Sequence, residues 1–195
     1  MFIQIVLALV FLVGLFFLLG FVVTEQRNIN EVQVKAPIEL CWEIYQDESR
    51  ISEWMKGVSS IQLIEGTAGR VGAKQKVIMA GAQGSSVSTS SAELERTITE
   101  VSAPKTFSYD YTNQMMSGRS EISFLANDST TYIKSTDVFS GKKLWLRSTL
   151  FLMKSSINNK TQAQFEKLKM IIEQDYKAQL KQEAERTSKI IDTEI

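Results

Sequence analysis

The most pronounced pattern in the chain is an uninterrupted apolar run at its start. Residues 2–23, FIQIVLALVFLVGLFFLLGFVV, contain no charged side chain, and only Gln4, Gly14 and Gly20 interrupt the aliphatic and aromatic residues. A helix of about 20 such residues is long enough to cross the roughly 30 Å hydrocarbon core of a bilayer. The insertion free energies of these residues sum to something on the order of −7 kcal/mol. The run therefore predicts a transmembrane helix.

Beyond this run, apolar and polar residues alternate with the period of two that is typical of half-buried strands. We expect a first strand over residues 28–34, with Ile29, Val32 and Val34 as its apolar set. Strands separated by short turns at this regular spacing indicate one antiparallel sheet. A Gly/Ser-rich loop is expected at 81–91. The six further strands are expected over residues 58–65, 73–80, 92–101, 106–112, 118–125 and 130–139.

Two short helices are expected between the first and second strands. Apolar residues recur every three or four positions from Ile38 to Tyr45, which is the pattern of one helix face. Asp47 offers an N-cap for the second helix, whose apolar side carries Trp54. Gly57 is expected to end that helix.

A long helix is expected at the C-terminal end. After Gly141 the chain contains no glycine or proline, and its apolar residues fall at spacings of three or four. We expect this helix to begin near Lys143 and to run past Ile172. Residues 173–195 are mostly polar and charged, which is typical of a solvated tail, and a partner-binding helix is the alternative. The element order predicts an α+β fold, in which one helix covers a curved antiparallel sheet of about seven strands.

The N-terminal run is interpreted as an uncleaved anchor, with a cleaved signal peptide as the alternative. No basic residue precedes the run, it exceeds the usual h-region, and no small-residue cleavage site follows it. Arg27 and Lys35 follow it, so the positive-inside rule places the soluble domain in the cytoplasm. We expect a single-pass membrane protein with an anchor over 1–24, a folded domain over 25–172 and a polar helical tail over 173–195.

Composition removes several classes of function. The 22 basic and 22 acidic residues cancel, so there is no long-range attraction to nucleic acid. The absence of histidine excludes Ser-His-Asp and Cys-His catalysis and His-ligated metal sites. Cys41 is the only cysteine, so no internal disulfide can form. Because no nucleotide-binding glycine motif or metal-ligand spacing occurs, we expect no metal and no cofactor.

Four motifs occur in order along the chain: VKAPIELCWEIYQD at 34–47, ISEWMKGVSSIQLIEG at 51–66, GRVGA at 69–73 and EVSAPKTFSY at 100–109. Together they resemble the SRPBCC superfamily, also called START-like, and its polyketide cyclase/dehydrase-like branch in particular. The resemblance implies a helix-grip fold, in which a curved sheet wraps around the last helix and leaves a hydrophobic cavity between them. It also implies binding of a lipid, sterol or polyketide, without a catalytic residue common to the family.

Nine residues are our candidates for contact with a ligand in such a cavity, and plain core packing is the alternative for the aromatic ones. Tyr109 and Tyr111 share one strand face and can hydrogen-bond the polar end of a ligand. Asp137 is expected to point inward near Arg96 or Arg119, as a desolvated base or, alternatively, as a paired or mouth-exposed carboxylate. The set is Trp54, Phe107, Tyr109, Tyr111, Met115, Phe124, Ile133, Asp137 and Phe165.

The leading hypothesis is membrane-anchored binding of a hydrophobic small molecule or lipid in an internal cavity, with residues 2–23 in the bilayer. A polyketide cyclase or dehydratase that acts in the same cavity is the first alternative. A membrane-tethered interaction scaffold without a ligand is the second. Because no catalytic motif is present, no catalytic residue is assigned and a non-enzymatic role is favoured.

Overall fold

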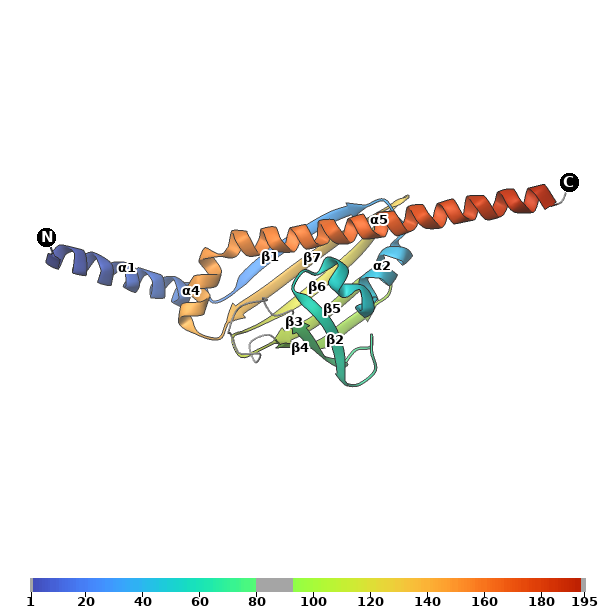
Figure 1. Cartoon of the computed structure of the whole chain (residues 1–195). Helices are drawn as coiled ribbons and strands as arrows, with labels where there is room; N and C mark the ends of the chain where they lie inside the picture. The colour runs from blue at the N-terminus through green and yellow to red at the C-terminus, as the bar shows by residue number, and fades with distance from the viewer. Residues whose placement is uncertain (1, 80–92, 194–195) are drawn as a thin grey trace.

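A computed structural model of the chain describes residues 2–79 and 93–193, so the loop predicted at 81–91 lies outside the described residues. The described elements follow the order expected from the sequence (Figure 1). They are α1 (Phe2–Val22), β1 (Gln26–Val34), α2 (Ile38–Gln46), the 3-10 turn η1 (Glu48–Arg50), α3 (Ile51–Trp54), β2 (Val58–Glu65), β3 (Lys74–Met79), β4 (Glu93–Ser102), β5 (Thr106–Thr112), β6 (Met116–Asn127), β7 (Thr130–Gly141), α4 (Leu144–Leu152) and α5 (Lys154–Thr193).

The seven strands form one antiparallel sheet in the order β1-β7-β6-β5-β4-β3-β2. From β2 to β7 each strand pairs with its neighbour along the chain, and β1 joins at the far edge, where Val32 lies opposite Ile133. The α+β prediction of about seven antiparallel strands with a long C-terminal helix is confirmed. The two short helices follow β1 as expected, and Asp47 caps η1 by accepting a hydrogen bond from the Ser49 amide at 3.0 Å.

Helix α5 lies over the inner face of the sheet, alongside β1 (Figure 1). Its apolar stripe is buried there, and Leu168 and Ile172 are fully inaccessible. Polar contacts hold the helix in register: the Asn30 side-chain amide donates to Asn158 Oδ1 at 3.1 Å, and the Lys35 amide donates to Glu173 at 3.0 Å. The C-terminal continuation extends beyond the sheet, away from α1, and Lys177–Ile190 is exposed (Figure 1).

The apolar core occupies the half of the sheet beneath α2, α3 and the middle of α5. Aromatic rings meet edge-to-face within it, as between Trp42 and Phe124 at 5.5 Å between centroids. Such pairs add about 0.5–1.5 kcal/mol to the free energy of burial. Members of this core include Val32, Val34, Tyr45, Trp54, Ile98, Phe107, Ile122, Phe124, Ile133, Phe165, Leu168 and Ile172.

The expectation of one continuous helix from Lys143 is wrong, because the helix breaks at Met153. The buried face of α4 packs against α1 and the end of β7, whereas the buried face of α5 packs against the sheet. Helix α4 runs in a different direction from α5, which places it against α1 (Figure 1). Trp145 and Phe151 of α4 are exposed. Ile29 was also misplaced: the inward residues of β1 are the even-numbered ones, so Ile29 faces outward.

Helix α1 extends away from the sheet and packs against α4 (Figure 1). Gly20 makes this contact close, because a Cβ there would lie 2.3 Å from the Leu144 carbonyl oxygen. The Ser148 hydroxyl donates a hydrogen bond to the Phe16 carbonyl oxygen. Among the residues that the structure describes, α1 is the one helix long and apolar enough to cross a membrane, and a signal sequence would pass the same test.

The packing of α5 gives a direct stability prediction. Leu168→Ala removes a fully buried side chain from the contact between helix and sheet, and it should lower the free energy of unfolding by about 2–5 kcal/mol. Met170→Ala, on the exposed side of the same helix, should change it by less than about 0.5 kcal/mol. Chemical denaturation followed by circular dichroism measures both. Equal losses in the two variants would contradict this packing.

Candidate functional site

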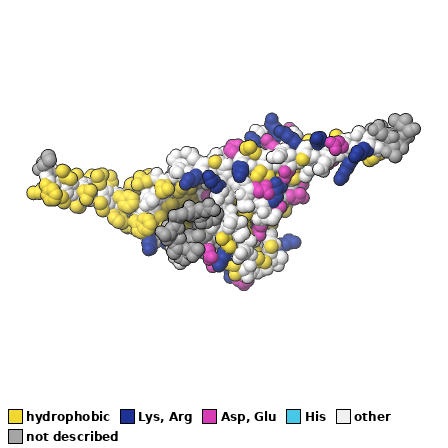
Figure 2. All heavy atoms as spheres, in the orientation of Figure 1, with side chains coloured by type: hydrophobic (Ala, Val, Ile, Leu, Met, Phe, Trp, Pro, Cys, Tyr) yellow, Lys and Arg dark blue, Asp and Glu magenta, His cyan; other side chains and the backbone are white. Residues whose placement is uncertain are grey.

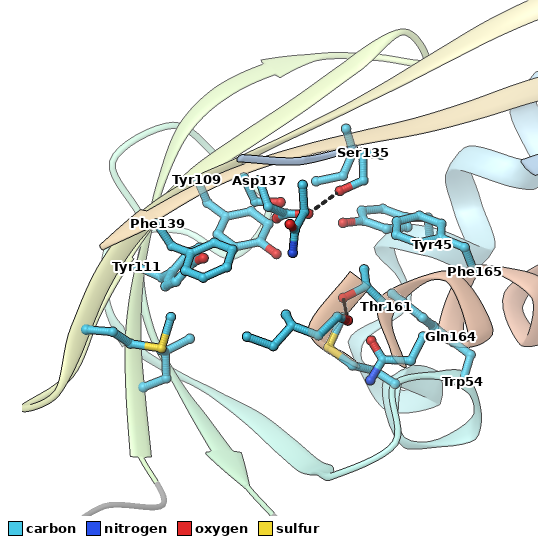
Figure 3. Close-up of a pocket in the computed structure, with 17 residues that line it drawn as sticks. Tyr45, Trp54, Tyr109, Tyr111, Ser135, Asp137, Phe139, Thr161, Gln164 and Phe165 are labelled. Carbon is cyan, nitrogen blue, oxygen red and sulfur yellow. Dashed lines mark hydrogen bonds between the residues drawn. The ribbon is translucent and has the colours of Figure 1, made fainter. Parts of the chain in front are cut away.

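A cavity of about 220 Å³ lies between α5 and the inner face of the sheet. Figure 3 shows Tyr109, Tyr111 and Asp137 on the sheet side of this cavity, facing Thr161 and Gln164 of α5. The cavity borders the aromatic core at Tyr45 and Trp54. Its lining residues are Asn28, Tyr45, Trp54, Met55, Leu94, Tyr109, Tyr111, Met116, Ser120, Ile122, Ser135, Asp137, Phe139, Ile157, Thr161, Gln164 and Phe165.

The wall of the cavity on the sheet side is polar because the inner face of the sheet changes character along its strands. The inward residues of β1 are Gln26, Asn28 and Asn30 at one end, and Val32 and Val34 at the other. Strands β6 and β7 pair beside β1 and continue the same division, with serines and a carboxylate near the cavity. One half of the inner face is thus a dry core, and the other half offers hydrogen-bonding groups.

Asp137 is the one carboxylate among the lining residues. The Ser135 hydroxyl donates a hydrogen bond to its Oδ2 at 2.7 Å (Figure 3). Burial raises the pKa of Asp137, and hydrogen bonds from Ser120 and Ser135 only partly oppose this shift. Its carboxyl group is therefore more readily protonated than a solvated one, and in that form it can donate as well as accept a hydrogen bond.

The expected arginine neighbours of Asp137 are engaged elsewhere. Arg119 forms an ion pair with Asp110 at 2.6 Å on the outer face of the sheet. Arg96 points inward, but its guanidinium pairs with Glu48 at 2.7 Å and lies 5.4 Å from the centre of the Tyr109 ring. Neither arginine forms an ion pair with Asp137, whose hydrogen-bonding neighbours are Ser120 and Ser135.

Three tyrosines follow one another along the cavity wall. The ring of Phe107 links Tyr45 to Tyr109, with centroid distances of 6.0 and 5.8 Å, and the centroids of Tyr109 and Tyr111 are 6.1 Å apart. Burial raises the pKa of each phenol, so the hydroxyls stay protonated and can act as donors. Gly118 makes room for this arrangement, since a Cβ at that position would lie 2.7 Å from the Tyr111 ring.

Two buried polar atoms of lining residues make no hydrogen bond with any residue that the structure describes. They are Asn28 Oδ1, an acceptor, and Trp54 Nε1, a donor. A buried polar group without a partner costs about 1–3 kcal/mol. Neither atom is accessible to water, so a hydrogen bond to a molecule in the cavity would require these side chains to move.

A groove on the surface adjoins the cavity. It shares Trp54 and Gln164 with the cavity, and lysines Lys56, Lys160 and Lys167 lie along it. The Gln164 side-chain amide donates to the Lys56 carbonyl oxygen at 3.2 Å, which ties α5 to the segment after α3. Trp54 and Gln164 therefore stand between the cavity and the surface.

The structure brings five of the nine predicted contact residues to the cavity: Trp54, Tyr109, Tyr111, Asp137 and Phe165. The other four lie elsewhere. Phe107, Phe124 and Ile133 are in the core. Met115 is exposed, whereas the next residue, Met116, lines the cavity.

Sequence reasoning missed the small and amide side chains of the cavity. Asn28, Ser120, Ser135 and Gln164 all line it. The strand period contained a signal for Asn28, because this residue has the same parity as Val32 and Val34 and must share their face. The described residues contain no group of three or more Cys, Asp or Glu side chains that could hold a metal ion.

Comparison with known proteins gives one family match. The family described as "Polyketide cyclase / dehydrase and lipid transport" matches residues 25–173. No curated protein matches the chain.

Solved structures with the same fold share little sequence with this chain. A hypothetical protein from Helicobacter pylori is 14% identical, with a TM-score of 0.62 over 76% of this chain and 88% of its own. Ara h 8.0201 is 15% identical, with a TM-score of 0.57 over 76% of this chain and 97% of its own. Norcoclaurine synthase from Thalictrum flavum, solved with dopamine and hydroxybenzaldehyde, is 13% identical, with a TM-score of 0.55 over 77% of this chain and 88% of its own. At these identities the likeness concerns the fold.

The raised pKa of Asp137 predicts how stability depends on pH. When the folded-state pKa exceeds the ordinary value of 3.8, the folded chain binds more protons, so stability falls as the pH rises. The stability that the protonated Asp137 contributes is fully present below pH 3.8 and is lost as the pH rises through the folded-state pKa. Asp137→Asn cannot ionise, so its free energy of unfolding does not fall in this pH range. The stability of the variant relative to wild type should therefore increase between pH 3.8 and the folded-state pKa.

Denaturant titrations at a series of pH values measure this difference. Asp110→Asn, at a solvent-facing position on the neighbouring outer surface, is the matched control and should not reproduce the trend. Parallel pH curves for wild type and Asp137→Asn would show that the carboxyl is not desolvated.

Proposed function

The chain belongs to the polyketide cyclase/dehydrase and lipid transport family, and we propose that its domain binds a hydrophobic small molecule or lipid in the cavity beneath α5. The family typically binds hydrophobic ligands. The observation that carries the proposal is the cavity itself, which has apolar groups on several sides and hydrogen-bonding groups on the sheet side. Apolar burial supplies the affinity, at about 25 cal/mol per Å² before the costs of association.

The size of the cavity limits what it can enclose. A cavity of ~150 Å³ accommodates benzene, so the 220 Å³ found here fits a ring or a short acyl segment. A longer ligand would extend between Trp54 and Gln164 into the adjoining groove. Small displacements of these two side chains would then join the cavity to the groove.

The polar wall favours a ligand with an uncharged polar end. Asp137 repels an anionic group whenever it is ionised, and the buried cation Arg96 already pairs with Glu48. The tyrosine hydroxyls can donate hydrogen bonds, and the protonated carboxyl group of Asp137 can both donate and accept them. A hydroxyl or carbonyl group on an apolar body satisfies this set.

The second part of the proposal is that α1 anchors the domain in a membrane. Its 21 residues have a mean hydropathy of 3.1 in the most apolar window, and almost none of that window is buried within the fold. The basic residues beyond it favour a cytoplasmic domain. In this proposal residues 1–24 form the anchor, 25–172 the ligand-binding domain, and 173–195 a solvated helical tail.

An acid–base reaction in the same cavity is a second candidate, and Asp137 is the observation that favours it. A carboxyl group with a raised pKa beside protonated phenols is suited to proton transfer. Under this alternative, Asp137→Asn would keep the ligand bound but abolish its conversion. Under the binding proposal no conversion occurs in either protein.

Ligand content tests the binding proposal. Thr161→Phe places a ring in the cavity, and an overlap that costs about 1–3 kcal/mol lowers affinity roughly ten- to hundredfold. Mass spectrometry of organic extracts from residues 24–195, purified without detergent, should find a near-stoichiometric hydrophobic molecule in wild type and little in the variant. The control Met170→Phe, at an exposed site on the same helix, should retain it. A wild-type protein without ligand would contradict the proposal.

Membrane fractionation tests the anchor. The full chain should stay with membranes after an alkaline carbonate wash and keep its mass of 22.0 kDa. Residues 24–195 alone should be released into the soluble fraction. A shortened mass together with a soluble domain would instead identify α1 as a cleaved signal.

A further inference from the structure

Helix α4 exposes a large apolar surface that the fold leaves uncovered. Trp145 is 42% exposed and Leu152 is 63% exposed, and Leu144, Phe151 and Met153 are exposed beside them. Only Leu146 and Ser148 of this helix are buried. Monomeric soluble domains seldom present so many large apolar side chains within ten residues.

The level of α4 relative to α1 is fixed by two contacts. Ser148 donates to the Phe16 carbonyl oxygen, and Gly20 lies directly against Leu144. Phe16 is six residues before the end of α1 at Val22, which is about 9 Å along a helix axis. The whole of α1 measures about 31 Å, close to the thickness of a hydrocarbon core. When α1 spans a bilayer, α4 therefore lies beside its last turns, at or below the surface.

The charged residues within α4 and next to it along the chain are all basic. No acidic residue occurs between Val138 and Phe165, and the basic residues that flank or interrupt α4 are Lys142, Lys143, Arg147 and Lys154. None of the four forms an ion pair with a carboxylate in the described part of the chain. Figure 2 shows the apolar surface of α1 running into the end of the domain where α4 lies, with basic side chains close by.

We propose that α4 is a second membrane-contacting element, an interfacial helix whose exposed apolar side chains lie among the acyl chains of lipids. The occupant of this face is the bilayer rather than another protein, because the face is continuous with α1 and is bordered by cations that match lipid phosphates. The inference rests on the proposed anchoring by α1 and extends it to a defined contact of the domain with the membrane.

This contact would set the position of the cavity. Helix α4 connects β7 to α5, and both of these elements line the cavity, through Phe139 and Ile157 respectively. Immersion of α4 holds this end of the cavity at the bilayer surface. An anchor alone, followed by a flexible linker, would not fix that position.

Quenching of tryptophan fluorescence by brominated acyl chains tests the proposal in the full chain. The chain has three tryptophans, α1 contains none, and Trp42 and Trp54 pack in the core of the domain. In vesicles of phosphatidylcholine and phosphatidylglycerol, brominated lipid should remove the emission of Trp145. Trp145→Phe should abolish this lipid-dependent loss, and the matched variant Trp42→Phe should retain it.

Flotation of the same vesicles separates the two proposals. Co-flotation with quenching that depends on Trp145 supports both of them. Co-flotation without quenching overturns the assignment of α4 alone and leaves its face for a protein partner or a second copy of the chain. Failure of the full chain to co-float overturns the anchor and, with it, the role of α4.

Discussion

The structure depends on the covering of a wide sheet by a single long helix. Seven strands at about 4.8 Å spacing span roughly 29 Å, whereas a helix with its side chains is about 10–12 Å across. Helix α5 follows β1, and α2 and α3 close one part of the remaining inner face. The part of the inner face that these helices do not fill forms the wall of the cavity, which α5 borders on its other side. Its position therefore follows from the mismatch in width and from where the short helices lie.

The chain places polar side chains on that remaining part of the inner face. An apolar wall there would favour collapse onto α5, because burying apolar surface is favourable. Asn28, Ser135 and Asp137 instead require hydrogen-bonding partners. The same division explains why one half of the sheet stabilises the fold and the other half is suited to a ligand. Helices α1 and α4 lie beyond the cavity end of the sheet.

The fold was predictable from the sequence because its signals are local and repeated. Strand alternation, the Asp47 cap and the buried stripe from Phe165 to Ile172 required no tertiary information. The break at Met153 was not predictable, since neither glycine nor proline marks it and it arises from two packing directions. The lining residues of the cavity were predictable only in part. Alternation indicates the inward face, but only the tertiary structure shows that Phe107 and Ile133 lie over the core whereas Tyr111 and Asp137 lie over the cavity.

The central claim is that a hydrophobic molecule with a polar end occupies the space between α5 and the sheet. The most direct measurement is an experimental structure of the chain isolated from its native source without added ligand. The account predicts continuous density between α5 and β5–β7, with a polar atom within hydrogen-bonding distance of Asp137 or a tyrosine hydroxyl. Density for ordered water alone, or side chains closed across the cavity, would contradict it.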